Sequence, residues 1–255
     1  MRTTVGVHRL LDRLGFHWNR AREYLHSPDP HYQAKRERIA AIWQRVQASG
    51  GREVLLYQDE CNYYRQPTLS QAYCQSGKQP LARRGYRSDT MTRVCAVLDA
   101  TRGRVLYLQA PRLSVSDLAS FYRRVREAYP QVERIWIVQD NNPVHFHPNL
   151  LVALEPQENP FPVTLAPNWS NEPKDWARQR FGHWKLPIQL VPLPTYASWC
   201  NPIEKLWRKF KQEIIHLHRL GDNLEALRQR AVAFFDQFAA GSAELLHYVG
   251  LGLPT

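Results

Sequence analysis

One stretch constrains the fold more than any other part of the chain: LVPLPTYASWCNPIEKLWRKFKQEII, residues 190–215. The apolar run up to Pro194 is typical of a buried strand, and Asn201-Pro202 after the next loop favours the start of a helix. Glu204 falls in the first turn of that helix, where the helix N-terminus favours negative charge. Apolar residues recur at helical spacing and predict a buried face: Ile203, Leu206, Trp207, Phe210 and Ile214. The stretch therefore predicts a strand, a loop and a helix that carries an acid at its start.

Two interpretations of Glu204 are open. Asn201-x-x-Glu204 has the pattern of a capping box, in which the glutamate serves only the helix. The alternative is a catalytic carboxylate, and it is favoured by two more acids after apolar strands, Asp59 in EVLLYQDE and Asp140 in RIWIVQDNN. Asp140 can also be a turn residue, since Asp-Asn is common in turns. Asp59 is followed by Glu60, and the strand pattern alone does not decide which of these two faces a site.

The remaining elements are predicted to be strand-rich first and then to alternate between strand and helix. Strands are expected at residues 54–58, 71–75, 92–98, 104–109, 134–139 and 188–193. Helices are expected at residues 33–48, 114–128, 148–154 and 223–238, in addition to the one that begins at Asn201. This order predicts an α/β fold in which a mixed sheet is flanked by helices.

Three motifs give the chain a resemblance to a known family. PTYASWCNPIEKLW resembles the third-acid motif of the mariner-like bacterial insertion-sequence transposases, although Ala197-Ser198-Trp199 replaces the usual Ser-Pro. VLLYQDE and WIVQDNNPVH resemble the first-acid and second-acid motifs of that family. The resemblance spans residues 50–235 and implies a ribonuclease-H-like DDE domain that cuts and joins DNA with divalent metal. It also implies that Asp59, Asp140 and Glu204 converge at one edge of the sheet.

The resemblance implies a metal-binding and catalytic role for each acid. Two divalent ions roughly 3.5–4 Å apart can clamp the attacking and leaving oxygens of a phosphodiester, and Mg²⁺ or Mn²⁺ prefers oxygen ligands. We therefore expect Asp59 to bridge two ions, Asp140 to bind one and Glu204 the other, with carboxylates about 4–8 Å apart. Asp175 falls where a shorter family spacing would place the third acid, but it lacks the strand and the Asn-Pro-Ile context. Glu204 is the better candidate.

The charge balance predicts a polyanionic partner. Lys and Arg number 34 and Asp and Glu 23, which gives a net charge of +11, and the basic residues cluster. The first cluster holds Arg9, Arg13, Arg20, Arg22, Lys35, Arg36 and Arg38. The second cluster holds Lys205, Arg208, Lys209 and Lys211. Clustering favours double-stranded DNA over the alternative of a soluble protein that is merely basic.

Hydropathy, cysteines and histidines limit where the protein is located and which cofactors it is expected to use. No apolar run approaches the length of about 18 residues that a membrane span needs, so no membrane partner is expected. The four cysteines lack C-x-x-C spacing, which favours reduced thiols in a cytoplasmic, nucleoid-associated protein over a zinc site. His145 and His147 lack an acidic or cysteine partner at metal-ligand spacing, and we interpret them as loop histidines.

The first 30 residues are expected to form a unit of their own. TTVGVHRLLDRLGFHW predicts an amphipathic helix that ends at Gly15, and the proline-containing segment 27–30 predicts a linker. Within the family the helix resembles part of a helix-turn-helix, so the chain resembles an N-terminally truncated transposase. In this interpretation His8, Arg9 and Arg13 contact DNA. An amphipathic helix that packs on the catalytic domain is the alternative. We place the catalytic domain at residues 31–255, with an insertion near 156–187.

The resemblance implies a transposase catalytic domain that cuts transposon ends and joins them to target DNA. It also implies a homodimer in the active complex, and DNA contacts through Lys205, Arg208 and Lys211. Two alternatives remain open: a DNA-binding relic that no longer transposes, and another ribonuclease-H-like nuclease that acts on RNA–DNA hybrids or junctions.

Overall fold

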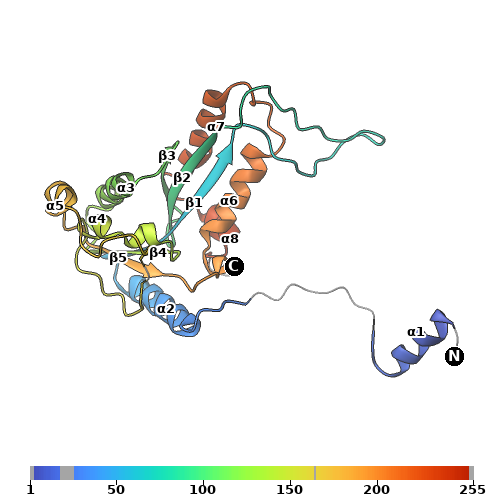
Figure 1. The fold of residues 1–255 in the computed structure, drawn as a ribbon, viewed down its shortest axis with the longest axis horizontal. Coiled ribbons are helices and arrows are strands. Elements are labelled where there is room, and N and C mark those ends of the chain that lie inside the picture. Colours follow the sequence, from blue (N-terminus) through green and yellow to red (C-terminus); the bar gives the residue numbers. More distant parts are fainter. Residues whose placement is uncertain (1–2, 18–25, 164, 253–255) are drawn as a thin grey trace.

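A five-stranded mixed sheet forms the centre of the molecule, with the strand order β3-β2-β1-β4-β5 (Figure 1). This computed structural model describes residues 3–17, 26–163 and 165–252, so Arg20 and Arg22 lie outside the described residues. The strands are β1 (Glu53–Tyr64), β2 (Met91–Asp99), β3 (Val105–Ala110), β4 (Arg134–Gln139) and β5 (Ile188–Pro192). β1 is central because it pairs antiparallel with β2 and parallel with β4. The predicted mixed sheet is confirmed.

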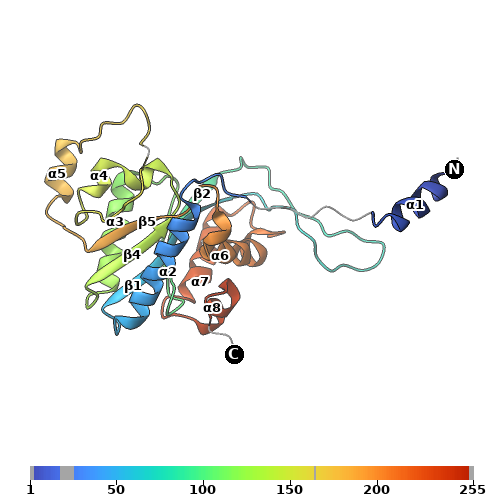
Figure 2. The same ribbon diagram turned by 90° about the horizontal axis from the view of Figure 1, so that it is seen from below.

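Helices cover both faces of the sheet (Figure 2). One face carries α2 (Tyr32–Ala48), α6 (Ile203–Phe210), α7 (Leu224–Asp236) and α8 (Ala243–Val249). The other face carries α3 (Val115–Ala128), α4 (Pro148–Leu151) and α5 (Asp175–Phe181). Side chains of β1 alternate between the two layers, so Leu55 and Tyr57 join the first core, and Val54 and Leu56 the second. The central strand is therefore buried on both sides.

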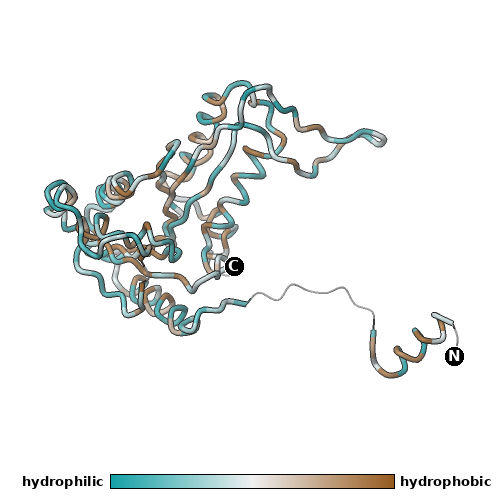
Figure 3. Tube along the Cα trace, viewed as in Figure 1, coloured by the Kyte–Doolittle hydropathy of each residue, from teal (hydrophilic) through white to brown (hydrophobic). Residues whose placement is uncertain are grey.

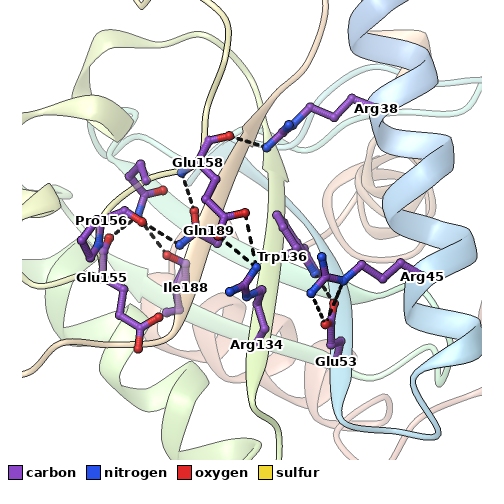
Figure 4. Close-up of polar contacts among 11 residues, drawn as sticks. Arg38, Arg45, Glu53, Arg134, Trp136, Glu155, Pro156, Glu158, Ile188 and Gln189 are labelled. Atoms are coloured by element: carbon purple, nitrogen blue, oxygen red, sulfur yellow. Dashed lines mark hydrogen bonds and ion pairs between the residues drawn. The ribbon is translucent and has the colours of Figure 1, made fainter.

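Polar contacts fasten α2 to the start of the central strand β1 and to the segment beside β5 (Figure 4). The guanidinium of Arg45 donates to the carboxylate of Glu53 at 2.6–2.9 Å, and the same carboxylate accepts a hydrogen bond from Trp136 Nε1 at 2.8 Å. Arg38 Nη2 donates to the backbone carbonyl of Glu158 at 2.6 Å. Arg38 was counted in the basic cluster expected to bind DNA, but it ties α2 to the segment beside β5.

Several elements depart from the prediction. β1 runs past Asp59 to Tyr64, because pairing with β2 continues after pairing with β4 has ended at Tyr57. The strand expected at 71–75 is wrong, since residues 65–90 form a long excursion away from the sheet (Figure 1). The helices α5 and α8 were not predicted, and α4 ends three residues early. Each of these three helices is too short for its apolar spacing to show a helical period.

The N-terminal helix α1 (Thr4–Arg13) forms as predicted and ends before Gly15, which has a φ of +79°. None of its residues is buried, and the exposed apolar residues are Val5, Val7, Leu10 and Leu11, followed by Leu14 and Phe16 beyond the helix. Figure 3 shows hydrophobic stretches along this N-terminal segment, away from the rest of the chain. The interpretation of α1 as a helix that packs on the catalytic domain is therefore wrong. The helix-turn-helix interpretation and the division at residue 31 stay predictions.

Two expectations about the chain as a whole concern membranes and thiols. Among the described helices, none combines the length and the apolar character that a membrane crossing requires. All four cysteines carry free thiols, two of them buried, as the cysteine spacing predicted.

Candidate active site

The three predicted acids line one cavity of about 340 Å³. Asp59 comes from β1, Asp140 follows the last residue of β4, and Glu204 lies in the first turn of α6. The cavity opens where β4 stops while β1 continues, which leaves the edge of β1 without a neighbour on that side. Folding thus brings together three carboxylates that are far apart in the sequence. The expected separation of about 4–8 Å between them stays a prediction.

Asp59, and not its neighbour Glu60, faces this cavity. Adjacent strand residues point to opposite faces, and Asp59 Oδ2 accepts a hydrogen bond from Trp207 Nε1 on α6 at 2.8 Å. Glu60 lies on the other side, where its carboxylate is 3.5 Å from His145. Burial, and then the negative charge of Glu204, raises the pKa of Asp59 to about 7, although the bond from Trp207 opposes this. Asp59 is therefore a carboxylate held in an unfavourable electrostatic position.

His145 bridges two acids behind the cavity. It is 1% exposed, and its Nε2 lies 3.2 Å from Asp140 Oδ1 and 3.5 Å from Glu60 Oε2. Burial alone would lower the pKa of His145, but the hydrogen bonds to Asp140 and Glu60 raise it to about 9. Burial alone would raise the pKa of Asp140, but hydrogen bonds from His145 and the Asn142 backbone hold it below its usual range. The interpretation of His145 as a loop histidine is wrong, because its acidic partners become neighbours only on folding.

The capping-box interpretation of Glu204 is also wrong. No side chain caps α6 within the described residues, and Asn201 Nδ2 donates instead to the backbone carbonyl of Gln58 on β1 at 3.0 Å. The buried Asn201 thus fastens the start of α6 to the strand that carries Asp59. Burial raises the pKa of Glu204, Lys211 and Arg208 oppose this rise, and the charge of Asp140 adds to it. Glu204 is consequently available to the cavity.

A buried ion pair supports the part of the cavity wall that contains Thr195. Lys35 Nζ lies 2.8 Å from Asp29 Oδ2, and the two side chains are 6% and 2% exposed. Asp29 Oδ2 also accepts a hydrogen bond from the backbone of Thr195 at 2.7 Å, and Ser27 Oγ donates to the Thr195 carbonyl at 2.5 Å. Thr195 lines the cavity, so the segment expected to be a linker is packed against the wall of the site. Lys35, counted in the basic cluster, is used inside the protein.

The predicted DNA-binding residues fall in three different places. Arg208 and Lys211 are exposed and lie close enough to Glu204 to lower its pKa. Lys205 is also exposed, but its ammonium group lies beside Gly250 after α8. His8, Arg9 and Arg13 are exposed on α1, which lies apart from the sheet and its helices (Figure 1). Of these six residues, folding places Arg208 and Lys211 beside the cavity.

The ligand chemistry of the cavity fits a hard divalent cation. All three acids offer carboxylate oxygens, and a cation would relieve the repulsion that contributes to the raised pKa values of Asp59 and Glu204. In the part of the chain that the structure describes, no group of three or more His, Cys, Asp or Glu side chains is already arranged to hold a metal ion. The cavity therefore provides ligands of the right type without a preformed cage.

Comparison with known proteins defines the class. Residues 54–228 match the family model described as DDE superfamily endonuclease. This match covers more than half of the chain, so the chain belongs to the DDE superfamily endonuclease family. The predicted resemblance to insertion-sequence transposases is confirmed by a similarity to the insertion element IS630 uncharacterized 39 kDa protein of Shigella sonnei, with 21% identity over 223 residues. That alignment covers 88% of this chain and 56% of the relative, so the chain spans little more than half of the relative's length.

Solved structures of Mos1 share the fold. The Mos1 mariner paired end complex with Mn has a TM-score of 0.55 at 14% identity, over 97% of this chain and 67% of that chain. The Mos1 strand transfer complex has a TM-score of 0.53 at 14% identity, over 96% of this chain and 65% of that chain. At this level of identity the likeness concerns the fold, and it confirms the predicted ribonuclease-H-like α/β architecture.

Proposed function

We propose that this chain is the catalytic domain of a DNA transposase, which cuts phosphodiester bonds at transposon ends and joins the 3′-hydroxyl to target DNA. The observation that carries the proposal is the cavity into which β1, the end of β4 and the start of α6 each present one carboxylate. The family match and the likeness to Mos1 complexes with transposon ends support it. Structures of Mos1 with Mn and with Mg support a divalent cofactor.

Asp59, Asp140 and Glu204 would hold two Mg²⁺ or Mn²⁺ ions through their carboxylate oxygens. When bound, such ions activate an oxygen nucleophile and neutralise charge on the leaving oxygen. The chain's own residues orient two of the ligands: Trp207 donates to Asp59 Oδ2, and His145 holds one oxygen of Asp140. Asn201 keeps α6 in place against β1. These contacts hold Asp59 and Asp140 and fix the position of the helix that carries Glu204.

The DNA backbone would approach along the α6 side of the cavity. Arg208 and Lys211 lie there beside Glu204, and guanidinium and ammonium groups neutralise phosphate charge. The partners we propose are double-stranded DNA at transposon ends and target, and a second copy of the chain in the active complex. A cytoplasmic, nucleoid-associated location follows from this role.

A plasmid-nicking assay tests the catalytic assignment. Supercoiled plasmid should be nicked by the wild-type chain in Mg²⁺ or Mn²⁺, and Glu204→Gln should reduce nicking at least about 100-fold, because it removes a ligand oxygen charge. Asp175→Asn is the matched control, since Asp175 lies at the start of α5 and does not line the cavity. It should nick like the wild type. Nicking that survives Glu204→Gln would overturn the assignment of this acid.

The same chain should nick without sequence preference. A helix-turn-helix needs one helix to brace the other in the major groove, and α1 is the one helix described before residue 31. Nothing among the described residues braces α1 to hold His8 and Arg9 in register with base edges. Phosphate contacts carry no direct sequence information. Competition between transposon-end and random duplexes measures the preference. Strong selectivity for the ends would show that residues 1–30 recognise the DNA sequence.

A further inference from the structure

A second hollow, which we call the aromatic groove, lies beside the catalytic cavity. It measures about 480 Å³. Aromatic and polar residues line it together with three aliphatic ones: Tyr32, Arg36, Trp43, Tyr57, Trp199 and Cys200, with Ile39, Ala40 and Leu251. One loop separates the two hollows: its residues up to Ser198 line the cavity, and its next two residues line the groove. The aromatic groove is therefore continuous with the wall of the proposed active site.

β1 also joins the two hollows. Tyr57 lies in the groove and Asp59 in the cavity, and these residues are two positions apart on the same strand. Residues at i and i+2 point to the same face and are about 7 Å apart. A group in the groove would thus lie within a nucleotide's reach of a phosphodiester at Asp59.

The groove presents flat aromatic surface together with a cation. Trp199 is 40% exposed, although its Nε1 donates to Tyr32 Oη at 3.4 Å. The guanidinium of Arg36 lies 5.7 Å from the centre of the Tyr32 ring, and Arg36 is exposed. The hydroxyl of Tyr32 is 3.9 Å from Cys200 Sγ, which links α2 to the loop. The rings are thus held in place by neighbours while part of their surface stays open.

The loop between the hollows is fixed in a costly backbone conformation. Tyr196 has a φ of +54°, in the left-handed region that favours glycine, and its side chain is 80% exposed at the cavity. Such conformations persist where the surroundings over-determine them, and they cluster at ligand sites. The Thr195 contacts to Ser27 and Asp29 provide that constraint here.

We propose that the aromatic groove binds an unpaired nucleobase of the DNA strand whose phosphodiester lies in the catalytic cavity. This inference rests on the proposed function and adds a subsite to it. Aromatic side chains stack on any base, because every base has a π face, and Arg36 supplies the charge that a flanking phosphate needs. The net charge of +11 and the position of the groove beside the cavity favour DNA over an apolar protein segment.

Equilibrium binding in EDTA, where no cleavage occurs, tests the groove. The probes are a blunt duplex, the same duplex with a four-nucleotide overhang at its 3′ or 5′ end, and overhang duplexes with abasic sites in place of the bases. The wild type should bind one base-containing overhang about 5- to 100-fold more tightly than its abasic counterpart, the usual range for one stacked base. Trp199→Ala should remove that preference.

Two variants control for damage to the fold. Trp199→Phe keeps an aromatic face and should retain most of the preference. Trp176→Ala removes another exposed tryptophan, 44% exposed on α5, and should leave the preference intact. Equal binding of base-containing and abasic overhangs by the wild type would overturn the proposal, and so would an undiminished preference in Trp199→Ala. An overhang preference in a wild type that nicks no DNA would refute the catalytic function while supporting the groove.

Discussion

Two aspartates near the same cavity, the buried Asp29 and the partly buried Asp59, have opposite electrostatic surroundings. Asp29 is paired with Lys35 and accepts hydrogen bonds from the Thr195 and His31 backbones, and these partners outweigh burial and hold its pKa below its usual range. Asp59 has one side-chain donor, Trp207, and burial together with Glu204 raises its pKa to about 7. Ionised Asp29 therefore stabilises the folded state, whereas ionisation of Asp59 destabilises it. A carboxylate like Asp59 is expected where a cation or substrate completes the charge balance.

The largest effect on stability should come from replacing Asp29, the carboxylate that Lys35 and two backbone groups stabilise. Asp29→Asn leaves Lys35 buried without its counter-charge, so we expect the free energy of unfolding to fall by about 3–5 kcal/mol. The pKa of Asp29 is lowered on folding, so its contribution is present above the unfolded value near 4 and is lost as the pH falls further. Urea denaturation at pH 7 measures this loss. Glu127→Gln, which breaks the exposed pair with Arg123, is the control and should cost about 0–1 kcal/mol.

Replacing Asp59 should have the opposite effect on stability from replacing Asp29. Folded Asp59 keeps its proton up to about pH 7, whereas the unfolded chain loses it near pH 4, so ionisation costs stability as the pH rises between these values. Asp59→Asn cannot ionise and should be more stable than the wild type at pH 8 without metal, by up to about 4 kcal/mol. At pH 4 the two proteins should unfold at similar urea concentrations. A variant less stable than the wild type at pH 8 would contradict the comparison.

A divalent cation should reduce the difference in stability between the wild type and Asp59→Asn. Binding to the folded state alone stabilises by about 2.7 kcal/mol at one hundred times the dissociation constant. Mn²⁺ should therefore raise the melting temperature of the wild type and of Asp175→Asn, and should have little effect on Asp59→Asn or Glu204→Gln. Equal shifts in all four proteins would place the ion elsewhere.

The smallest effect concerns the basic surface beside Glu204. The logarithm of DNA affinity falls with the logarithm of salt concentration by about 0.9 for each neutralised phosphate. Arg208→Ala with Lys211→Ala should reduce that slope by about 2, whereas Lys205→Ala should leave it unchanged, because its ammonium lies beside Gly250. Fluorescence anisotropy over a salt series gives the slopes. An unchanged slope after replacing all three residues would show that this face is only solvated.

Local patterns in the sequence predicted most secondary-structure elements and the three acids. They could not predict which distant residues would contact one another. β4 matches its predicted range because its apolar centre, Ile135 to Val138, is bounded by polar residues on both sides, and Asp140 follows from that boundary. The choice of Asp59 over Glu60 rested on the resemblance, since either can face a site until Trp207 and His145 are placed. The role of His145 was missed because, besides Asp140 five positions before it, its second partner Glu60 is 85 positions away. The Asp29–Thr195 contact joins segments still further apart, so the packing of the proline-containing segment 27–30 against the cavity wall could not be predicted from the sequence.

The distribution of the three acids over β1, β4 and α6 has a consequence for synthesis of the protein on the ribosome. About 145 residues separate Asp59 from Glu204, and translation at about 5–20 residues per second takes roughly 7–30 s to make them. β1, β2 and β3 are adjacent in sequence and can pair while later parts are still being made. The third carboxylate appears only after the whole sheet has been translated. A nascent chain can therefore hold an assembled sheet while its set of proposed metal ligands is still incomplete, and that set is complete only once Glu204 has been translated.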